Sequence, residues 1–171
     1  LQEGLAEGRL PLRVTHNDTK FNNVMIDDAT GAAVCVIDLD TVMPGLSLYD
    51  FGDAIRSGTS TAEEDERDLE KVAMDPALFE GFARGFLETA GPALTDAETN
   101  LLAFSAKLIT LEIGVRFLAD HLEGDVYFRI HRTGHNLDRA RNQFRLVADM
   151  EAQMPRMEAI IHRLCGPSPH P

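Results

Sequence analysis

One short stretch of this sequence gathers side chains that are suited to phosphate chemistry. A polar loop, HNDTKFNN at 16–23, precedes two segments rich in β-branched residues, and the second of these ends at Asp38. This order predicts that Asp18, Asn23 and Asp38 meet at one end of a β-hairpin. Their oxygens suit Mg²⁺, which usually keeps phosphates and waters as its other ligands. An Asp beside such a metal can accept the proton of a hydroxyl that attacks phosphorus.

The order His-x-Asp-x-x-x-x-Asn, a hairpin and then Ile-Asp resembles the catalytic loop and metal-binding Asp of the kinase-like phosphotransferases. The sequences of the loop and of IDLDT at 37–41 are similar to those of the aminoglycoside phosphotransferases and choline kinases, and among them to the N-acetylhexosamine 1-kinase group. GVRFL at 114–118 and GDVYF at 124–128 also resemble that group. The resemblance implies ATP and Mg²⁺ as cofactors and a small-molecule substrate, an amino sugar or hexose phosphorylated at its anomeric hydroxyl.

Three residues receive direct roles from this resemblance. Asp18 is expected to align and deprotonate the acceptor hydroxyl, and Asn23 and Asp38 to bind Mg²⁺ on the nucleotide phosphates. Each also has a purely structural alternative, because a loop Asp can cap a turn and Asn or Asp can close an Asx-turn or a strand end. Lys20 lies where some kinases place a Lys against the transferred phosphate; the alternative is a solvent-exposed Lys.

Two further residues are candidates for holding the acceptor. Asp40 follows Asp38 by two, so on a strand both share a face; the resemblance suggests a role with sugar hydroxyls or the metal, and the alternative is surface charge. Arg116 lies on an apolar helical segment, between Glu112 and Asp120 one turn away on either side. Its side chain contacts either the substrate or, in the structural alternative, only these two carboxylates.

Supporting roles fall to His16 and Asp50. His16 is expected to order the loop through hydrogen bonds. Asp50 opens an Asp-Phe-Gly triplet, in which protein kinases bind metal, but it comes after the hairpin that already ends in Asp38. The resemblance assigns it a structural role, bonding back to the catalytic loop.

Bulk composition narrows the function classes. The chain has 171 residues and a net charge of −12, from 16 Lys and Arg against 28 Asp and Glu, which disfavours nucleic acid and anionic membranes as partners. Two Cys without framework spacing suggest a reducing compartment. With no signal peptide and no bilayer-spanning apolar run in the sequence, we expect a cytoplasmic location.

The pattern along the chain predicts an α+β fold, mostly α: strands at 24–27 and 33–38, then several helices. Pro44-Gly45 predicts a turn, Asp75-Pro76 a helix start, and Thr95 with Glu98 a capping box that opens a helix running to about His121. That helix is apolar around most of its circumference, which predicts a position in the middle of a bundle. The charge run at 63–68 is expected to be a solvated loop or loose helix, or else a mobile flap near the acceptor.

The resemblance places residues 1–165 in a kinase-like C-terminal lobe and leaves the N-terminal nucleotide lobe absent, with a disordered tail at 166–171. On this interpretation the isolated chain is inactive, and the face left open by the missing lobe favours self-association. Two rival functions remain. One is a kinase for choline, homoserine or an aminoglycoside; the other is a non-catalytic fragment or binding domain of the same fold.

Overall fold

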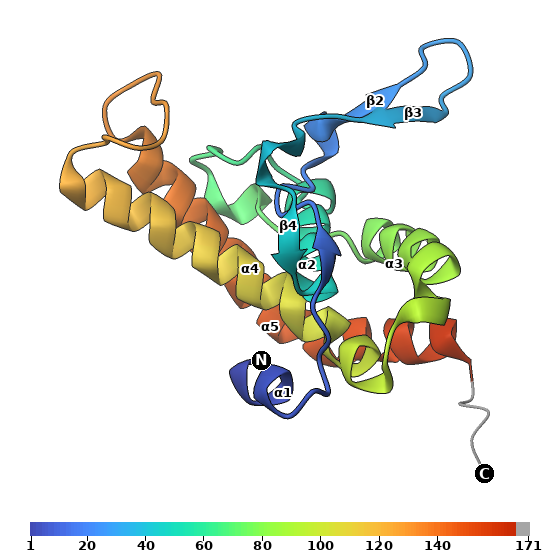
Figure 1. Cartoon of the computed structure of the whole chain (residues 1–171). Coiled ribbons are helices and arrows are strands. Elements are labelled where there is room, and N and C mark those ends of the chain that lie inside the picture. Colours follow the sequence, from blue (N-terminus) through green and yellow to red (C-terminus); the bar gives the residue numbers. More distant parts are fainter. Residues whose placement is uncertain (167–171) are drawn as a thin grey trace.

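Two long helices form the base of the molecule. In the computed structural model, which describes residues 1–166, α4 (Asp96–Glu123) and α5 (His135–Cys165) run side by side and are joined by the loop 124–134 (Figure 1). The capping box predicted at Thr95 and Glu98 is present at the start of α4. Apolar side chains of α4 and α5 contribute much of the core, among them Leu102, Ala106 and Met150.

The shorter helices pack against this base. Helix α2 (Ser47–Gly58) lies on α4, and α3 (Pro76–Ala90) lies against α5 and α2. Gly52 allows the close approach of α2 to α4, because a Cβ there would stand 2.6 Å from the carbonyl oxygen of Ser105. The predicted start of α3 is confirmed: Asp75 caps it by accepting from the backbone N–H groups of Ala77 and Leu78.

The strands form two small antiparallel pairs on one side of the helices. Strands β2 and β3 make the predicted hairpin, which projects away from the helical body (Figure 1). The remaining elements are short: α1 Gln2–Ala6, β1 Arg13–Thr15, β2 Val24–Ile26, β3 Ala33–Val36, β4 Met43–Gly45, and 3₁₀ turns Phe21–Asn23, Leu39–Thr41, Leu69–Lys71 and Gly91–Ala93. The mostly α, α+β class predicted from the sequence is confirmed.

One predicted turn is instead a strand. Residues Met43–Gly45 form β4, which pairs with β1 so that Val14 lies opposite Pro44. Pro lacks an N–H donor and is tolerated at the edge of a sheet, and this sheet has only two strands. The pairing joins residues about thirty apart in the chain, and the local Pro-Gly signal does not reveal it.

The charge run at 63–68 is anchored to the helices, so the prediction of a solvated loop is wrong for its centre. Glu64 pairs with Arg56 of α2 at 2.8 Å, and Asp65 lies 3.0 Å from Nε2 of His135, which is buried in α5. Asn142 donates to the carbonyl of Glu63. Side chains supplied by α2 and α5, remote in sequence, hold this segment in place.

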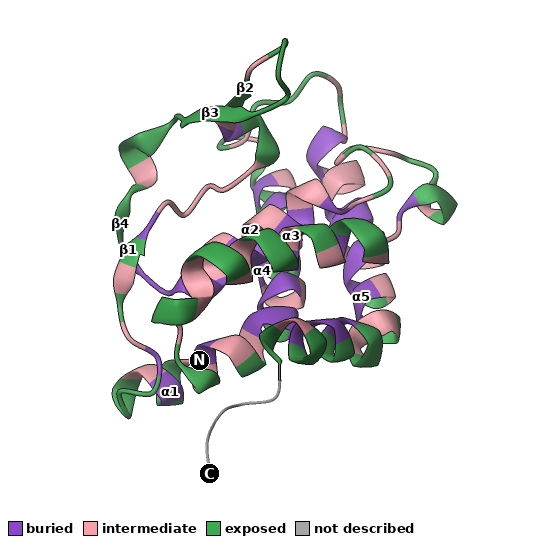
Figure 2. Ribbon diagram, turned by 90° about the vertical axis from the view of Figure 1, so that its right-hand side faces the viewer, coloured by how far each residue is buried: buried purple, intermediate pink, exposed green. Residues whose placement is uncertain are grey.

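The expectation that α4 lies inside a bundle is only half right. Figure 2 shows buried residues concentrated on α2, α4 and α5, while the hairpin is mostly exposed. On α4 itself, Leu102, Ala103 and Ile109 are buried, but Phe104, Leu111 and Val115 are exposed. Among residues 1–166, no helix combines the length and apolar character needed to cross a bilayer. The tail predicted to be disordered lies, apart from Gly166, outside the described residues.

Candidate active site

The loop that carries Asp18 is braced by the first turn of α2. The carboxylate of Asp50 accepts hydrogen bonds from the backbone N–H groups of His16, at 2.8 Å, and of Asn17, at 2.7 Å. The carbonyl of Asp50 accepts from the hydroxyl of Thr19 at 2.6 Å. Asn17 has a left-handed backbone, with φ of 62°, a conformation that Asn tolerates better than most residues. The loop therefore has one defined shape.

His16 ties the same loop to the end of the hairpin. Its Nε2 lies 3.0 Å from the carbonyl oxygen of Ile37, directly before Asp38, and its own carbonyl accepts from the hydroxyl of Thr41. Its buried Nδ1 has no hydrogen-bond partner among residues 1–166. These contacts link the loop at 16–23 to the segment that bears Asp38.

Asp18, Lys20 and Asn23 are in direct contact. Nδ2 of Asn23 donates to the Asp18 carboxylate at 3.0 Å and to the Asp18 carbonyl at 2.8 Å. Lys20 Nζ lies 3.0 Å from the other carboxylate oxygen of Asp18. Because the nitrogen of the Asn23 amide is bonded to Asp18, the amide oxygen is the atom left to bind a cation.

Asp38 and Asp40 form a crowded acidic pair beside this group. Asp38 has a left-handed backbone, with φ of 64°, immediately before the 3₁₀ turn that contains Asp40. The Asp40 carboxylate, through a shared hydrogen bond and its charge, raises the pKa of Asp38; Asp18 adds to the rise and Lys20 opposes it. The charges of the two segments are therefore close enough to influence each other. Within residues 1–166 no three His, Cys, Asp or Glu side chains form a ready-made metal cage.

A cavity of about 590 Å³ opens beside Asp18. Its walls come from the loop at 16–23, α2, α4, α5, the charge run and the loop after α4. Arg116 and Lys20 line it together with Asp18, whereas Asp40 does not. Of the two predicted acceptor-binding residues, the structure thus brings only Arg116 into the space next to Asp18.

The family model described as "Phosphotransferase enzyme family" (APH) matches residues 1–94. That match spans more than half of the chain. The chain belongs to this phosphotransferase family. The matched region contains the catalytic loop, the hairpin, Asp38, Asp40 and Asp50, and it ends just before α4. Arg116 and the far wall of the cavity therefore lie outside the matched region, and the structure alone connects them to the phosphotransferase loop.

Within residues 1–166, Arg116 does not form the ion-pair chain with Glu112 and Asp120 that is the alternative to substrate contact. Its guanidinium lies 5.6 Å from the ring centre of Tyr127 and 5.4 Å from that of Phe128, a cation–π arrangement. This alternative is not realised because α4 leaves Arg116 exposed at this point, so its charge stays hydrated and needs no carboxylate partner.

Asp120, considered in the sequence only as a neighbour of Arg116, positions this wall of the cavity. Its buried carboxylate accepts from the backbone N–H groups of Val126, Tyr127 and Phe128 at 2.7–2.9 Å and from Asn136 at 2.8 Å. These hydrogen bonds outweigh the effect of burial and lower the pKa of Asp120. In the sequence, this arrangement is indicated by an Asp three residues before the helix end and by Gly124 directly after that end.

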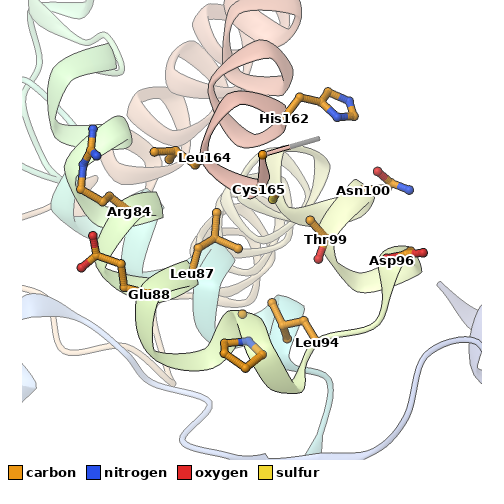
Figure 3. A pocket seen from close by; sticks show the side chains of 13 residues that line it. Arg84, Leu87, Glu88, Leu94, Asp96, Thr99, Asn100, His162, Leu164 and Cys165 are labelled. Carbon is orange, nitrogen blue, oxygen red and sulfur yellow. The ribbon is translucent and has the colours of Figure 1, made fainter. Parts of the chain in front are cut away.

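A second hollow, of about 490 Å³, lies at the far end of the molecule (Figure 3). It is formed by α3, the first turns of α4 and the end of α5, where His162 and Cys165 are found. None of the residues that line it belong to the catalytic loop or the hairpin. For a member of the phosphotransferase family, the cavity beside Asp18 is therefore the candidate active site.

Proposed function

We propose that this protein transfers the γ-phosphoryl group of ATP to a hydroxyl of a small molecule, and that the acceptor is an amino sugar or related hexose phosphorylated at its anomeric position. The observation that carries the proposal is the placement of Asp18. It contacts Asn23 and Lys20, and together with Lys20 and Arg116 it lines one cavity. An acceptor in that cavity has its hydroxyl next to the carboxylate.

In the proposed reaction, Asp18 aligns the acceptor hydroxyl and takes its proton as the oxygen attacks the γ-phosphorus. The bond between that phosphorus and the bridging oxygen breaks, and ADP leaves. Alignment and charge stabilisation supply most of the rate in such transfers. Lys20, 3.0 Å from Asp18, is suited to stabilise charge on the transferred group. Asp50 and His16 act indirectly, by fixing the shape of the loop.

The side chains around Asp18 fit Mg²⁺, with Asp38 and the amide oxygen of Asn23 as the residues that would hold it. All of these donors are oxygens, and Mg²⁺ is typically bound by one or two carboxylates together with substrate phosphates. A cation would also relieve the repulsion that raises the pKa of Asp38. When bound, Mg²⁺ would neutralise negative charge on the nucleotide phosphates. Asp40 is proposed to support Asp38 in this role.

The charge of the cavity supports a neutral, hydroxyl-rich acceptor over a cationic one. Four acidic and five basic side chains line it, so a quaternary ammonium or aminoglycoside would meet no net negative field. Several of these charges already pair within the wall, as Arg56 does with Asp53 and Glu64. The rings of Tyr127 and Phe128 add aromatic surface next to Arg116.

The test is a transfer assay with labelled ATP and the full-length protein against hexoses, N-acetylhexosamines, choline, homoserine and aminoglycosides. We expect transfer to the N-acetylhexosamines or hexoses, and a fall in kcat of roughly 10²- to 10⁴-fold in D18N. Thermal unfolding of D18N, followed by circular dichroism, is expected to match the unmodified protein. Unchanged turnover in D18N would reject the mechanism, and transfer only to cationic acceptors would reject the substrate class.

A further inference from the structure

One face of α4 carries an apolar stripe whose spacing alternates between four and three residues. Such spacing repeats every seven residues and follows one line along a helix. We name this stripe the α4 seam; its members are Phe104, Leu108, Leu111, Val115, Leu118 and Leu122. The seam extends over about 27 Å at 1.5 Å per residue.

The α4 seam is not covered by the rest of the described chain. None of its six residues is buried, and the exposed fractions of Val115 and Leu122 are 52% and 77%. The opposite side of α4 faces the core through Leu102, Ala106 and Ile109. In Figure 1, α4 passes in front of α5. The stripe is therefore separate from the face that holds the fold together.

A seven-residue repeat of this kind is complementary to another helix that carries the same repeat. We infer that the α4 seam of one copy of this chain pairs, in parallel, with the α4 seam of a second copy. Phe104, Leu111 and Leu118 take one of the two core positions of the repeat, and Leu108, Val115 and Leu122 take the other. A two-fold axis along the helices makes the interface self-complementary.

The charges that border the seam favour the parallel pair. In the repeat, Lys107 occupies the position just before one core residue and Glu112 the position just after the next. In a parallel pair, Lys107 of one copy lies opposite Glu112 of the other, and symmetry forms this ion pair twice. In an antiparallel arrangement each flanking position faces the same flanking position of the other helix. Lys107 and Glu112 then do not meet, and neither of the two ion pairs forms. Lys107 now contacts Glu151 at 3.3 Å, an exposed pair that is easily exchanged.

Sedimentation velocity of the whole chain over a range of concentrations tests the pairing. We expect a monomer–dimer equilibrium, and a dimer dissociation constant raised at least tenfold in L111E/V115E, which places charge in the seam. The matched control is V34E/V36E, which places the same charges on the exposed hairpin strand β3 and is expected to leave the equilibrium unchanged. Far-ultraviolet circular dichroism of both variants verifies that the helices are retained.

Charge reversal then tests the orientation. K107E and E112K are each expected to weaken the dimer by about five- to tenfold, and the double variant K107E/E112K to restore it. A chain that stays monomeric at all concentrations overturns the inference, as does a dimer that survives L111E/V115E. Loss of the dimer in V34E/V36E alone assigns association to the hairpin instead. A double variant that fails to restore the dimer overturns the parallel arrangement.

Discussion

Two groups of carboxylates in this molecule have opposite surroundings. Glu98, at the start of α4, is buried and accepts from Arg13 at 2.7 Å, from Ser47 at 2.6 Å and from the backbone of Thr95. Asp38, at the end of the hairpin, is exposed and stands beside the like charge of Asp40. The protein itself supplies the hydrogen bonds that stabilise the charge of Glu98. A bound cation would instead stabilise the charges of Asp38 and Asp40.

The pKa values express this contrast. Hydrogen bonds from Arg13, Ser47 and Thr95 outweigh burial and lower the pKa of Glu98 to about 2, while Asp40 raises the pKa of Asp38. Carboxylates of the first kind stabilise the fold in their charged form. Carboxylates of the second kind cost stability when charged, and such groups cluster at functional sites.

Replacement of Glu98 by Gln is expected to be the most destabilising of these changes. A pKa lowered from 4.5 to about 2 corresponds to on the order of 3 kcal/mol of unfolding free energy. Urea denaturation at pH 7 checks this value, with E88Q, at an exposed glutamate of α3, as the control. A loss in E98Q no larger than in E88Q would show that the Arg13–Glu98–Ser47 group does not stabilise the fold.

The same residue sets a pH dependence. Because the folded pKa of Glu98 lies below its unfolded value, its contribution is complete above about pH 4.5 and is lost as the pH falls toward 2. The stability difference between the unmodified protein and E98Q should therefore shrink over that interval. A difference that stays constant down to pH 3 would contradict the assignment.

Asp50 connects the two kinds of group, since it is a satisfied carboxylate that shapes the loop carrying Asp18. In D50N one of the two backbone N–H groups faces an amide NH₂ in place of an oxygen, so we expect a loss of about 2 kcal/mol in unfolding free energy. We also expect kcat to fall by at least tenfold in the full-length protein, because Asp18 loses its alignment. The control is D96N, at an exposed position in α4; equal kcat in D50N and D96N would remove the positioning role.

The smallest effect is expected for D40N. Unlike E98Q and D50N, this variant is not expected to lower the stability of the fold. Removing the neighbouring charge should lower the pKa of Asp38 toward its ordinary value, as ¹³C NMR titration of the Asp carboxyls would show. Unfolding free energy should be unchanged or slightly higher. An unchanged pKa for Asp38 would mean that the two carboxylates do not interact.

Features encoded by neighbouring residues could be predicted from the sequence. The capping box at Thr95, the cap at Asp75 and the hairpin all depend on residues a few positions apart. Features that depend on distant partners could not. Strand β4 pairs with β1, and side chains of α2 and α5 hold the charge run at 63–68.

The candidate site divides in the same way. The order of residues at 16–38 predicted that Asp18 and Asn23 lie together, because both belong to the short loop at 16–23. The partners of Arg116 escaped prediction because they belong to the loop after α4, whose path is set by Asp120. The exposure of one face of α4 also depends on what packs around the helix, which the apolar pattern does not specify.

The most direct test of the account is calorimetric titration of the protein with Mg·ATP. We expect the unmodified protein to bind, D38N to bind at least tenfold more weakly, and D28N, an exposed hairpin aspartate, to bind as the unmodified protein does. Equal affinity in D38N and D28N would contradict the claim that Asp18, Asn23 and Asp38 form one site for a metal-bound nucleotide.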